Sequence, residues 1–176
     1  MSVDLAKLRV IHYPDPRLRQ TAKPVARFDD ALLALGRRML ELMRAEKGVG
    51  LAAPQVGVML RLFVANHTGE AGDDRIICNP TLSDLVGGET AEEGCLSLPE
   101  VRVQVRRAMH CRLRAVDAAG KPIDLEADGF AARVWQHETD HLNGVLILDR
   151  MGPTDRIAVK KTLAALEDSF RRRGRR

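Results

Sequence analysis

The chain has 176 residues, of which 45% are hydrophobic and 30% are charged, a balance typical of one globular domain rather than a disordered or fibrous chain. No apolar run approaches the roughly 20 residues of a transmembrane helix, and the first residues lack the hydrophobic core of a signal peptide. We therefore expect a cytoplasmic protein without a membrane partner. The formal net charge of +4 would suit a nucleic-acid partner, but its meaning depends on where the charge lies.

The N-terminal part predicts an extended segment followed by a helix. Over residues 1–27, Pro14 and Pro16 disfavour helix and favour turn or extended geometry. From residue 28 to about 47, apolar residues recur at three- and four-residue steps and predict an amphipathic helix. Asp29 or Asp30 can cap its start, and Gly48 stands where a terminating glycine is common.

The rest of the chain predicts strands first and helices later. Four β-rich runs with turn residues between them are expected at 60–66, 75–80, 101–107 and 110–117. A helix is expected at 129–142, a short strand at 145–149 and an amphipathic helix at 154–171. With no internal repeat and no linker, the sequence predicts a single α+β domain over 1–170, followed by a basic tail at 171–176.

Three cysteines are too few, and odd in number, for a disulfide framework. Each is therefore a buried thiol, a metal ligand or a nucleophile. We predict that Cys78 and Cys111 are buried small residues, as free cysteines usually are. Cys95 would be assigned the same way if it stood alone, but a nearby motif changes its interpretation.

That motif is WQHETDHLNG at residues 135–144, which has metal-ligand spacing. His137 and His141 lie four residues apart and would share one face of a helix, with Glu138 beside them. The alternative is a pair of polar surface histidines. A metzincin protease would need a third histidine at the position of Ile147, and a thermolysin-like protease would need a downstream glutamate. Only Glu167 lies in that region, on a helix that looks solvated.

An upstream segment, EGCLSLP at 93–99, offers Cys95 as a third ligand. One thiolate and two imidazoles suit ferrous iron, zinc, cobalt or nickel and leave a position open for water. A further segment, GVGLAAPQVG at 48–57, matches a dinucleotide-binding pattern only superficially, because it follows a helix and Pro54 prevents another from starting. It is better interpreted as a loop that lines a cleft, with Gln55 as an amide donor, although a plain turn remains the alternative.

Taken together, these motifs closely resemble the peptide deformylase family. The family is marked by GxGLAAxQ, EGCLS and QHExDHLxG in that order, and the chain has all three, as GVGLAAPQ (48–55), EGCLS (93–97) and QHETDHLNG (136–144). The resemblance also includes YPDPRLR (13–19), so it extends from about residue 8 to 150.

The resemblance implies a metal-dependent hydrolase that removes the formyl group from the initiator methionine of new polypeptides and releases formate. It implies Fe²⁺ as the usual ion, with Zn²⁺, Ni²⁺ or Co²⁺ able to substitute, and antiparallel sheets packed around the helix that carries HExxH. The implied site residues are the ligands Cys95, His137 and His141, the general acid/base Glu138, and the oxyanion donors Gln55 and the Leu96 backbone N–H.

An enzyme of this kind needs an apolar pocket for methionine. The candidates lie in or beside the motifs and could equally be core residues: Val49, Leu51, Phe130 and Val134. Gly50 would let the substrate backbone approach as an added strand. The remaining conspicuous residues are expected to be structural: Trp135 in packing, Asp140 paired with Arg107, and His12, His67 and His110 as ordinary surface or loop residues.

Two other functions remain open. One is an HExxH zinc peptidase with a different third ligand, and the other is a catalytically silent metal-binding or ribosome-associated relative. The presence of Glu138 and Gln55 argues against a silent protein, which would not need them.

The positive charge is concentrated at the end of the chain. RRRGRR at 171–176 holds five arginines, and without them the chain would have 23 basic and 24 acidic residues. The tail is either a solvated terminus or a phosphate-seeking segment that holds the enzyme near ribosomal RNA. No sequence-specific nucleic-acid binding is expected.

Overall fold

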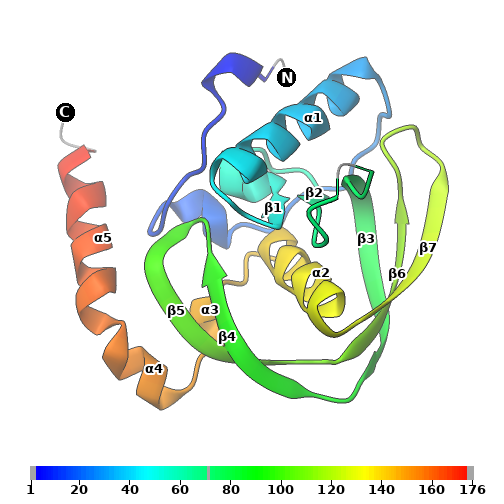
Figure 1. The fold of residues 1–176 in the computed structure, drawn as a ribbon. Helices are drawn as coiled ribbons and strands as arrows, with labels where there is room; N and C mark the ends of the chain where they lie inside the picture. The colour runs from blue at the N-terminus through cyan, green and yellow to red at the C-terminus, as the bar shows by residue number, and fades with distance from the viewer. Residues whose placement is uncertain (1–2, 71, 174–176) are drawn as a thin grey trace.

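The computed structural model describes residues 3–70 and 72–173 (Figure 1). Its helices are α1 (Asp30–Ala45), α2 (Gly129–Leu142), α3 (Ile147–Arg150), α4 (Pro153–Ala158) and α5 (Lys160–Arg173), with 3₁₀ turns at Leu5–Lys7, Pro16–Arg19 and Ala53–Val56. Its strands are β1 (Gly50–Ala52), β2 (Leu62–Ala65), β3 (Arg75–Val86), β4 (Glu89–Cys95), β5 (Leu98–Arg107), β6 (His110–Val116) and β7 (Pro122–Asp128). None of the helices in these residues is long and apolar enough to cross a membrane.

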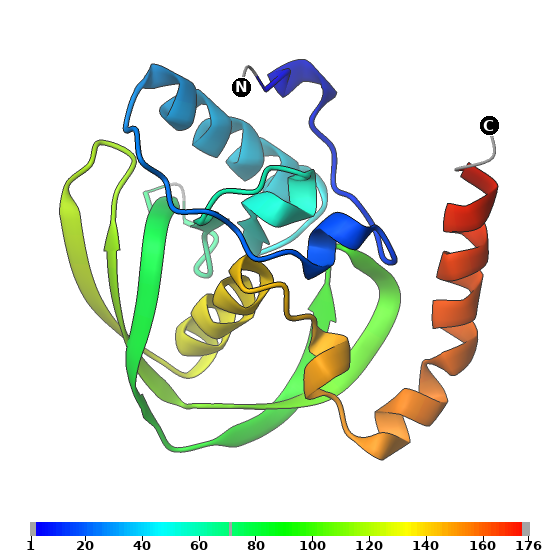
Figure 2. The same ribbon diagram turned by 180° about the vertical axis from the view of Figure 1, so that it is seen from behind.

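The strands form two antiparallel sheets on either side of one helix. Five strands pair in the order β1-β2-β3-β6-β7, and β4 and β5 form a separate hairpin. Helix α2 lies between the five-stranded sheet and the hairpin, as Figure 1 and the opposite view in Figure 2 show. The predicted α+β fold, with antiparallel sheets around the helix that carries HExxH, is confirmed.

Helix α1 covers β1 and β2 with its apolar stripe. Asp29 begins the helix, because its carboxylate accepts the backbone N–H of Leu32 at 3.1 Å. At the other end the left-handed residue is Lys47, with φ 57°, and the N–H of Gly48 bonds to the carbonyl of Met43 at 2.8 Å. The start was therefore predicted correctly, whereas the terminating residue is one position earlier than the glycine suggested.

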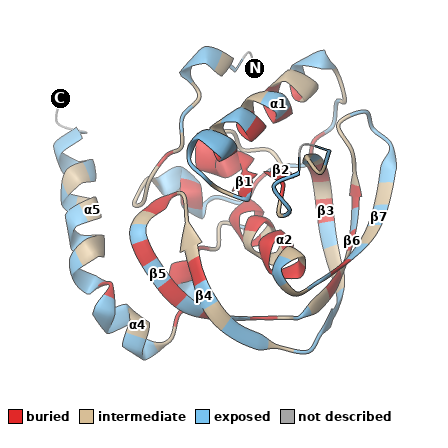
Figure 3. Cartoon of the chain, viewed as in Figure 1, coloured by how far each residue is buried: buried red, intermediate tan, exposed pale blue. Residues whose placement is uncertain are grey.

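The hairpin β4–β5 shows how burial alternates along one strand. Every second residue of β5 from Val101 to Val105 is buried, and the residues between them face solvent. The buried valines pack with the N-terminal segment and with α3 in one apolar cluster. Figure 3 shows this alternation along β5, and it also shows that α2 is mostly buried whereas α5 is largely exposed.

Two predictions for the C-terminal region are wrong. Residues 147–150 form the short helix α3 rather than a strand, and the carboxylate of Asp149 accepts the N–H of Leu146 at 2.8 Å at its start. An apolar run alone does not distinguish a buried strand from a buried helical turn. The single helix expected at 154–171 is interrupted at Val159, which is buried against β5 while the residues around it are exposed.

Candidate metal centre and active site

Helix α2 and the end of β4 bring the three predicted ligands together. The donor atoms of Cys95, His137 and His141 all lie within 4.8 Å of one another, and the Cys95 Sγ is 3.2 Å from the His141 Nε2. Cys95 is the last residue of β4, where the register with β5 shifts after Gly94. This irregularity ends the regular pairing of the hairpin at the residue whose thiol faces the helix.

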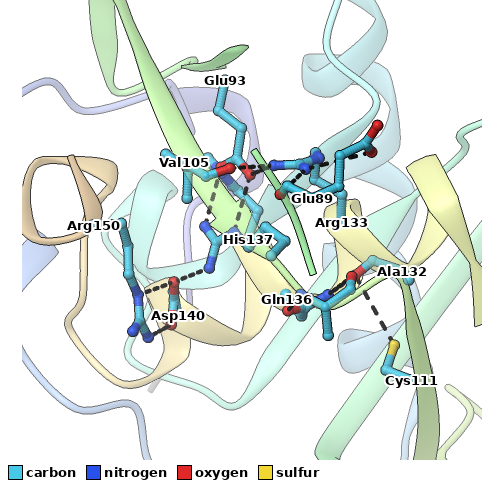
Figure 4. A network of polar contacts seen from close by, with 12 residues as sticks. Glu89, Glu93, Val105, Cys111, Ala132, Arg133, Gln136, His137, Asp140 and Arg150 are labelled. Atoms are coloured by element: carbon cyan, nitrogen blue, oxygen red, sulfur yellow. Dashed lines mark hydrogen bonds and ion pairs between the residues drawn. The ribbon is translucent and has the colours of Figure 1, made fainter. Parts of the chain in front are cut away.

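Glu93 fixes the orientation of one imidazole. Its Oε2 accepts a hydrogen bond from the His137 Nδ1 at 3.0 Å, which leaves the Nε2 lone pair free for a metal. The same carboxylate accepts two bonds from Arg107 at 3.0 Å and one from Arg133 at 2.9 Å (Figure 4). Burial alone would raise the pKa of Glu93, but the hydrogen bonds from His137 and Arg107 lower it to about 2.

Sequence reasoning had not given Glu93 a role. The available signal was its place in EGCLS, two residues before Cys95, because carboxylates near metal ligands often orient an imidazole. The predicted pair of Asp140 and Arg107 is confirmed, and Arg150 also binds Asp140 through two hydrogen bonds of 3.0 and 2.6 Å (Figure 4). The buried Arg107 and Asp140, together with the partly exposed Arg150, thus connect α2 to β5 and α3.

Glu138 is a buried carboxylate at the centre of the site. It is 3% exposed, and its Oε2 has no hydrogen-bond partner among the described residues. Burial raises the pKa of this carboxyl group to about 7. A carboxyl group in such a state is suited to exchanging protons near neutral pH.

Donor chemistry tests whether a metal fits here. The set consists of one soft thiolate and two imidazoles, which are the donors that such ions prefer. The bond to Glu93 fixes the tautomer of His137. These residues fit a divalent ion of the iron, cobalt, nickel or zinc group.

The structure gives a reason for glycine at position 50 that differs from the expected one. A Cβ at this position would lie 2.4 Å from the Glu138 Oε1, so the absence of a side chain makes room for the carboxylate. The expected role, close approach of a substrate strand, is not tested by this contact.

We predict that Gly50→Ala lowers kcat/KM by about 100-fold, because displacing a reacting group by about 1 Å is enough for such a loss. The measurement is formate release from formyl-Met-Ala-Ser, together with bound metal per chain. Gly152→Ala is the matched control, because a Cβ there meets nothing within 4 Å. Unchanged turnover in Gly50→Ala would contradict the requirement for space at this position.

The amide of Gln55 is held in a fixed orientation. Its Oε1 accepts the backbone N–H of Ala52 at 2.8 Å, so the Nε2 must face the other way. That nitrogen lies 3.2 Å from the Ser97 Oγ and 3.5 Å from the Cys95 Sγ. Gln55 is 1% exposed, and both Gln55 and Leu96 line the same cavity as Glu138.

This cavity has a volume of about 760 Å³ and includes most of the predicted site residues. Val49 and Phe130, which are 38% and 56% exposed, line it together with the buried Val134. Leu51 does not line the cavity, because it is fully buried in the cluster under α1. Sequence reasoning also missed His12, which lines the cavity instead of being an ordinary surface residue.

The predictions for Trp135 and for the two other cysteines agree with the structure. Trp135 is buried in the main core, and Cys78 and Cys111 are fully buried thiols. His110 lies outside the cavity, with its Nδ1 2.9 Å from the Asp128 carboxylate.

The family model for polypeptide deformylase matches residues 7–157 of the chain. The chain belongs to the polypeptide deformylase family. A peptide deformylase from Thermotoga maritima is 42% identical over 166 residues, covering 93% of this chain and 99% of that protein. A peptide deformylase from Rhodopirellula baltica is 46% identical over 147 residues, covering 82% of this chain and 73% of that protein.

Solved structures of the deformylase family have the same fold. The Legionella pneumophila peptide deformylase matches with a TM-score of 0.85 at 40% identity, over 96% of this chain and 98% of that one. The Plasmodium falciparum peptide deformylase matches with a TM-score of 0.89 at 34% identity, over 93% of this chain and 97% of that one. These matches extend beyond the three motifs to nearly the whole chain.

Proposed function

We propose that this deformylase removes the formyl group from the N-terminal methionine of new polypeptides and releases formate, with Cys95, His137 and His141 holding one divalent metal ion. The observation that carries this proposal is the meeting of three ligand atoms within 4.8 Å beside the buried Glu138. The test is formate release from formyl-Met-Ala-Ser by the metal-loaded protein.

When bound, the metal would act as a Lewis acid that lowers the pKa of a water molecule and polarises the formyl carbonyl. Glu138, a buried carboxyl group that lines the cavity, accepts a proton from the attacking water. The same carboxyl group then returns the proton to the nitrogen of the departing methionine. No covalent bond to the chain is required, so Cys95 acts as a ligand and not as a nucleophile.

The two donors beside the ligand residue stabilise charge on the substrate. As the carbonyl carbon is attacked, negative charge develops on its oxygen, and the Gln55 Nε2–H and the Leu96 backbone N–H donate to it. By analogy with other oxyanion holes, each donor would contribute about 3 kcal/mol to the transition state. The bond from Ala52 to the Gln55 Oε1 supports this role, because it holds the donating end of the amide toward Cys95.

The methionine side chain would lie against the apolar part of the cavity. Val49, Phe130 and Val134 provide apolar surface there, and Gly50 of β1 lines the same cavity. Phe130 is 56% exposed and lines the cavity, so its ring is available for contact with a substrate side chain.

We further propose Fe²⁺ as the resident ion and predict oxygen-sensitive activity. Ferrous iron and a thiolate ligand are both oxidisable, so the iron-loaded enzyme should lose activity in air. Enzyme loaded with Ni²⁺ or Co²⁺ should keep its activity under the same conditions. The measurement is residual kcat after equal incubation under air and nitrogen, and equal losses under both gases would count against iron.

We also propose that residues 1–170 form the catalytic domain and that residues 171–176 form a basic tail. The tail would hold the enzyme near the ribosome in the cytoplasm, where formylated chains emerge. Arg171 to Arg173 continue helix α5, and Arg171 pairs with Asp168 at 3.1 Å; residues 174–176 lie outside the described part of the chain. The positive charge of these arginines supports binding to a phosphate-rich partner such as the ribosome.

Deleting residues 171–176 is predicted to weaken salt-sensitive binding to ribosomes and leave turnover of short peptides unchanged. Co-sedimentation with ribosomes at two salt concentrations measures the first effect, and formate release measures the second. Full-length and truncated proteins that sediment equally at both salt concentrations would count against the tail as a tether.

A further inference from the structure

A second cavity lies on the opposite face of the catalytic helix. It has a volume of about 420 Å³ and is bounded by α2, β3, the end of β5 and Arg150. Gln136, Thr139, Asp140 and Asn143 contribute to it at helical spacing. Val134, His137, Glu138 and His141 follow the same spacing on the active-site side, and the centres of the two sets are roughly 160° apart around the helix axis.

The charge of this second cavity is strongly positive. Asp140 is the only acidic residue among its lining residues. Four arginines line it: Arg61, Arg106, Arg107 and Arg150. Arg107 and Arg150 share Asp140, and Arg107 also binds Glu93. Arg61 and Arg106 have no acidic partner in the described part of the chain, so their charge is not neutralised by protein.

Arg61 is nevertheless held in place. Its Nη1 donates to the Asn143 Oδ1 at 2.8 Å and its Nη2 to the Pro80 carbonyl at 3.2 Å. Both acceptors are neutral, so they orient the guanidinium without cancelling its charge. Arginine held in this way is suited to a planar, bidentate contact with a phosphate.

Two other polar side chains at the cavity are not open to a ligand. The Thr139 Oγ1 is closed off from solvent, so a ligand oxygen in the cavity does not reach it. The Gln136 amide is used by the backbone of Ala108 and Ala132. The unpaired guanidinium groups are therefore the groups that can bind a ligand here.

We propose that this cavity binds a phosphate group carried on an organic body of about the size of a nucleotide. The volume exceeds what a free phosphate fills and lies in the usual range for small-molecule sites. Arg61 and Arg106 would contact the phosphate, and the apolar wall of Pro80, Leu82 and Leu85 would face the rest of the ligand. The phosphate can belong to a free nucleotide or to a strand of RNA.

The test is calorimetric titration of the metal-loaded enzyme with inorganic phosphate, adenosine monophosphate and a hexameric uridine RNA. Arg106→Gln is expected to raise the Kd of the bound probe about tenfold. Arg61→Gln removes the second unpaired guanidinium group and is expected to raise it by a similar factor. Arg156→Gln is the matched control, because Arg156 is exposed on α4 outside this cavity. The Kd of the probe for this variant should equal that for the wild type.

The outcomes separate the sources of the phosphate. Tight binding of the monophosphate identifies a free nucleotide, whereas binding of RNA alone, weakening steeply with salt, identifies a strand. The proposal is overturned if no probe binds at 1 mM, or if binding is unchanged in both Arg106→Gln and Arg61→Gln. Phosphate held at the metal would give the second result, because neither substitution touches the metal ligands. Unfolding temperature and bound metal, measured for each variant, ensure that a weaker Kd is not caused by a loss of folding.

Discussion

Glu138→Ala is expected to lower kcat for formyl-Met-Ala-Ser by about 10³-fold while leaving the metal bound, because proton transfer by a positioned group contributes 10²–10⁴-fold. Glu138 is not among the three clustered ligand residues, so its removal should not release the ion. Its Oε2 has no partner in the described residues, so truncation leaves no broken hydrogen bond there. Turnover by stopped assay and metal per chain by elemental analysis measure the two halves of this prediction.

Two control variants make this result specific. Glu138→Gln preserves the shape of the side chain but cannot accept the proton, so its activity should fall nearly as far as that of the alanine variant. Glu41→Ala removes a largely exposed carboxylate on α1, whose side chain is 60% exposed, and should turn over like the wild type. A Glu138→Gln enzyme with more than a tenth of wild-type kcat would show that another group moves the proton.

Cys95→Ser is expected to weaken metal binding by at least about 100-fold, because even residues that only orient metal ligands cost 10–100-fold in affinity when they are replaced. Serine keeps the size of the side chain but replaces the soft thiolate by a hydroxyl group that does not ionise near neutral pH. Metal retained after gel filtration, together with kcat for metal-supplemented protein, measures the effect. Cys111→Ala, at a buried thiol outside the cluster, should retain its metal.

The same variant separates the deformylase from an HExxH peptidase. A peptidase with a third ligand elsewhere would keep both metal and activity after Cys95→Ser. The Gln55 Nε2, at 3.5 Å from the Cys95 Sγ, would lose a contact in either case, so loss of metal rather than loss of activity is the decisive readout.

The sequence predicted the parts of the fold with strong periodicity. The helix expected at 129–142 matches α2 residue for residue, and the helix expected at 28–47 overlaps α1 to within two residues at each end. The three ligands could be predicted because two lie on one helical face, and the third stands in a motif of its own. These are local patterns that the chain carries without reference to tertiary contacts.

Strands β1, β4 and β7 were not predicted. β1 has only three residues, and β4 reads ETAEEGC, with few apolar residues and two glutamates in a row. Its inward-facing Glu93 is paired with arginines and His137 instead of being apolar, so hydrophobic alternation does not mark this strand. Tertiary pairing of charges determines β4, and local propensity contains no signal for it.

His12 and Gly50 show the same limitation inside the site. His12 reaches the cavity because the N-terminal segment pairs with the loop after Cys95, where the Tyr13 N–H bonds to the Ser97 carbonyl at 2.9 Å. The requirement for glycine at position 50 follows from the carboxylate of a residue 88 positions later. Contacts over such separations exist only in the folded chain.

The most direct test of the central claim is the product of formyl-Met-Ala-Ser incubated with anaerobically iron-loaded wild-type enzyme. The proposed function predicts equal amounts of formate and intact Met-Ala-Ser, and neither product above background with Glu138→Ala. Cleavage between the amino acids without formate would indicate a peptidase. A metal-loaded wild-type enzyme that releases no formate would contradict the proposed function.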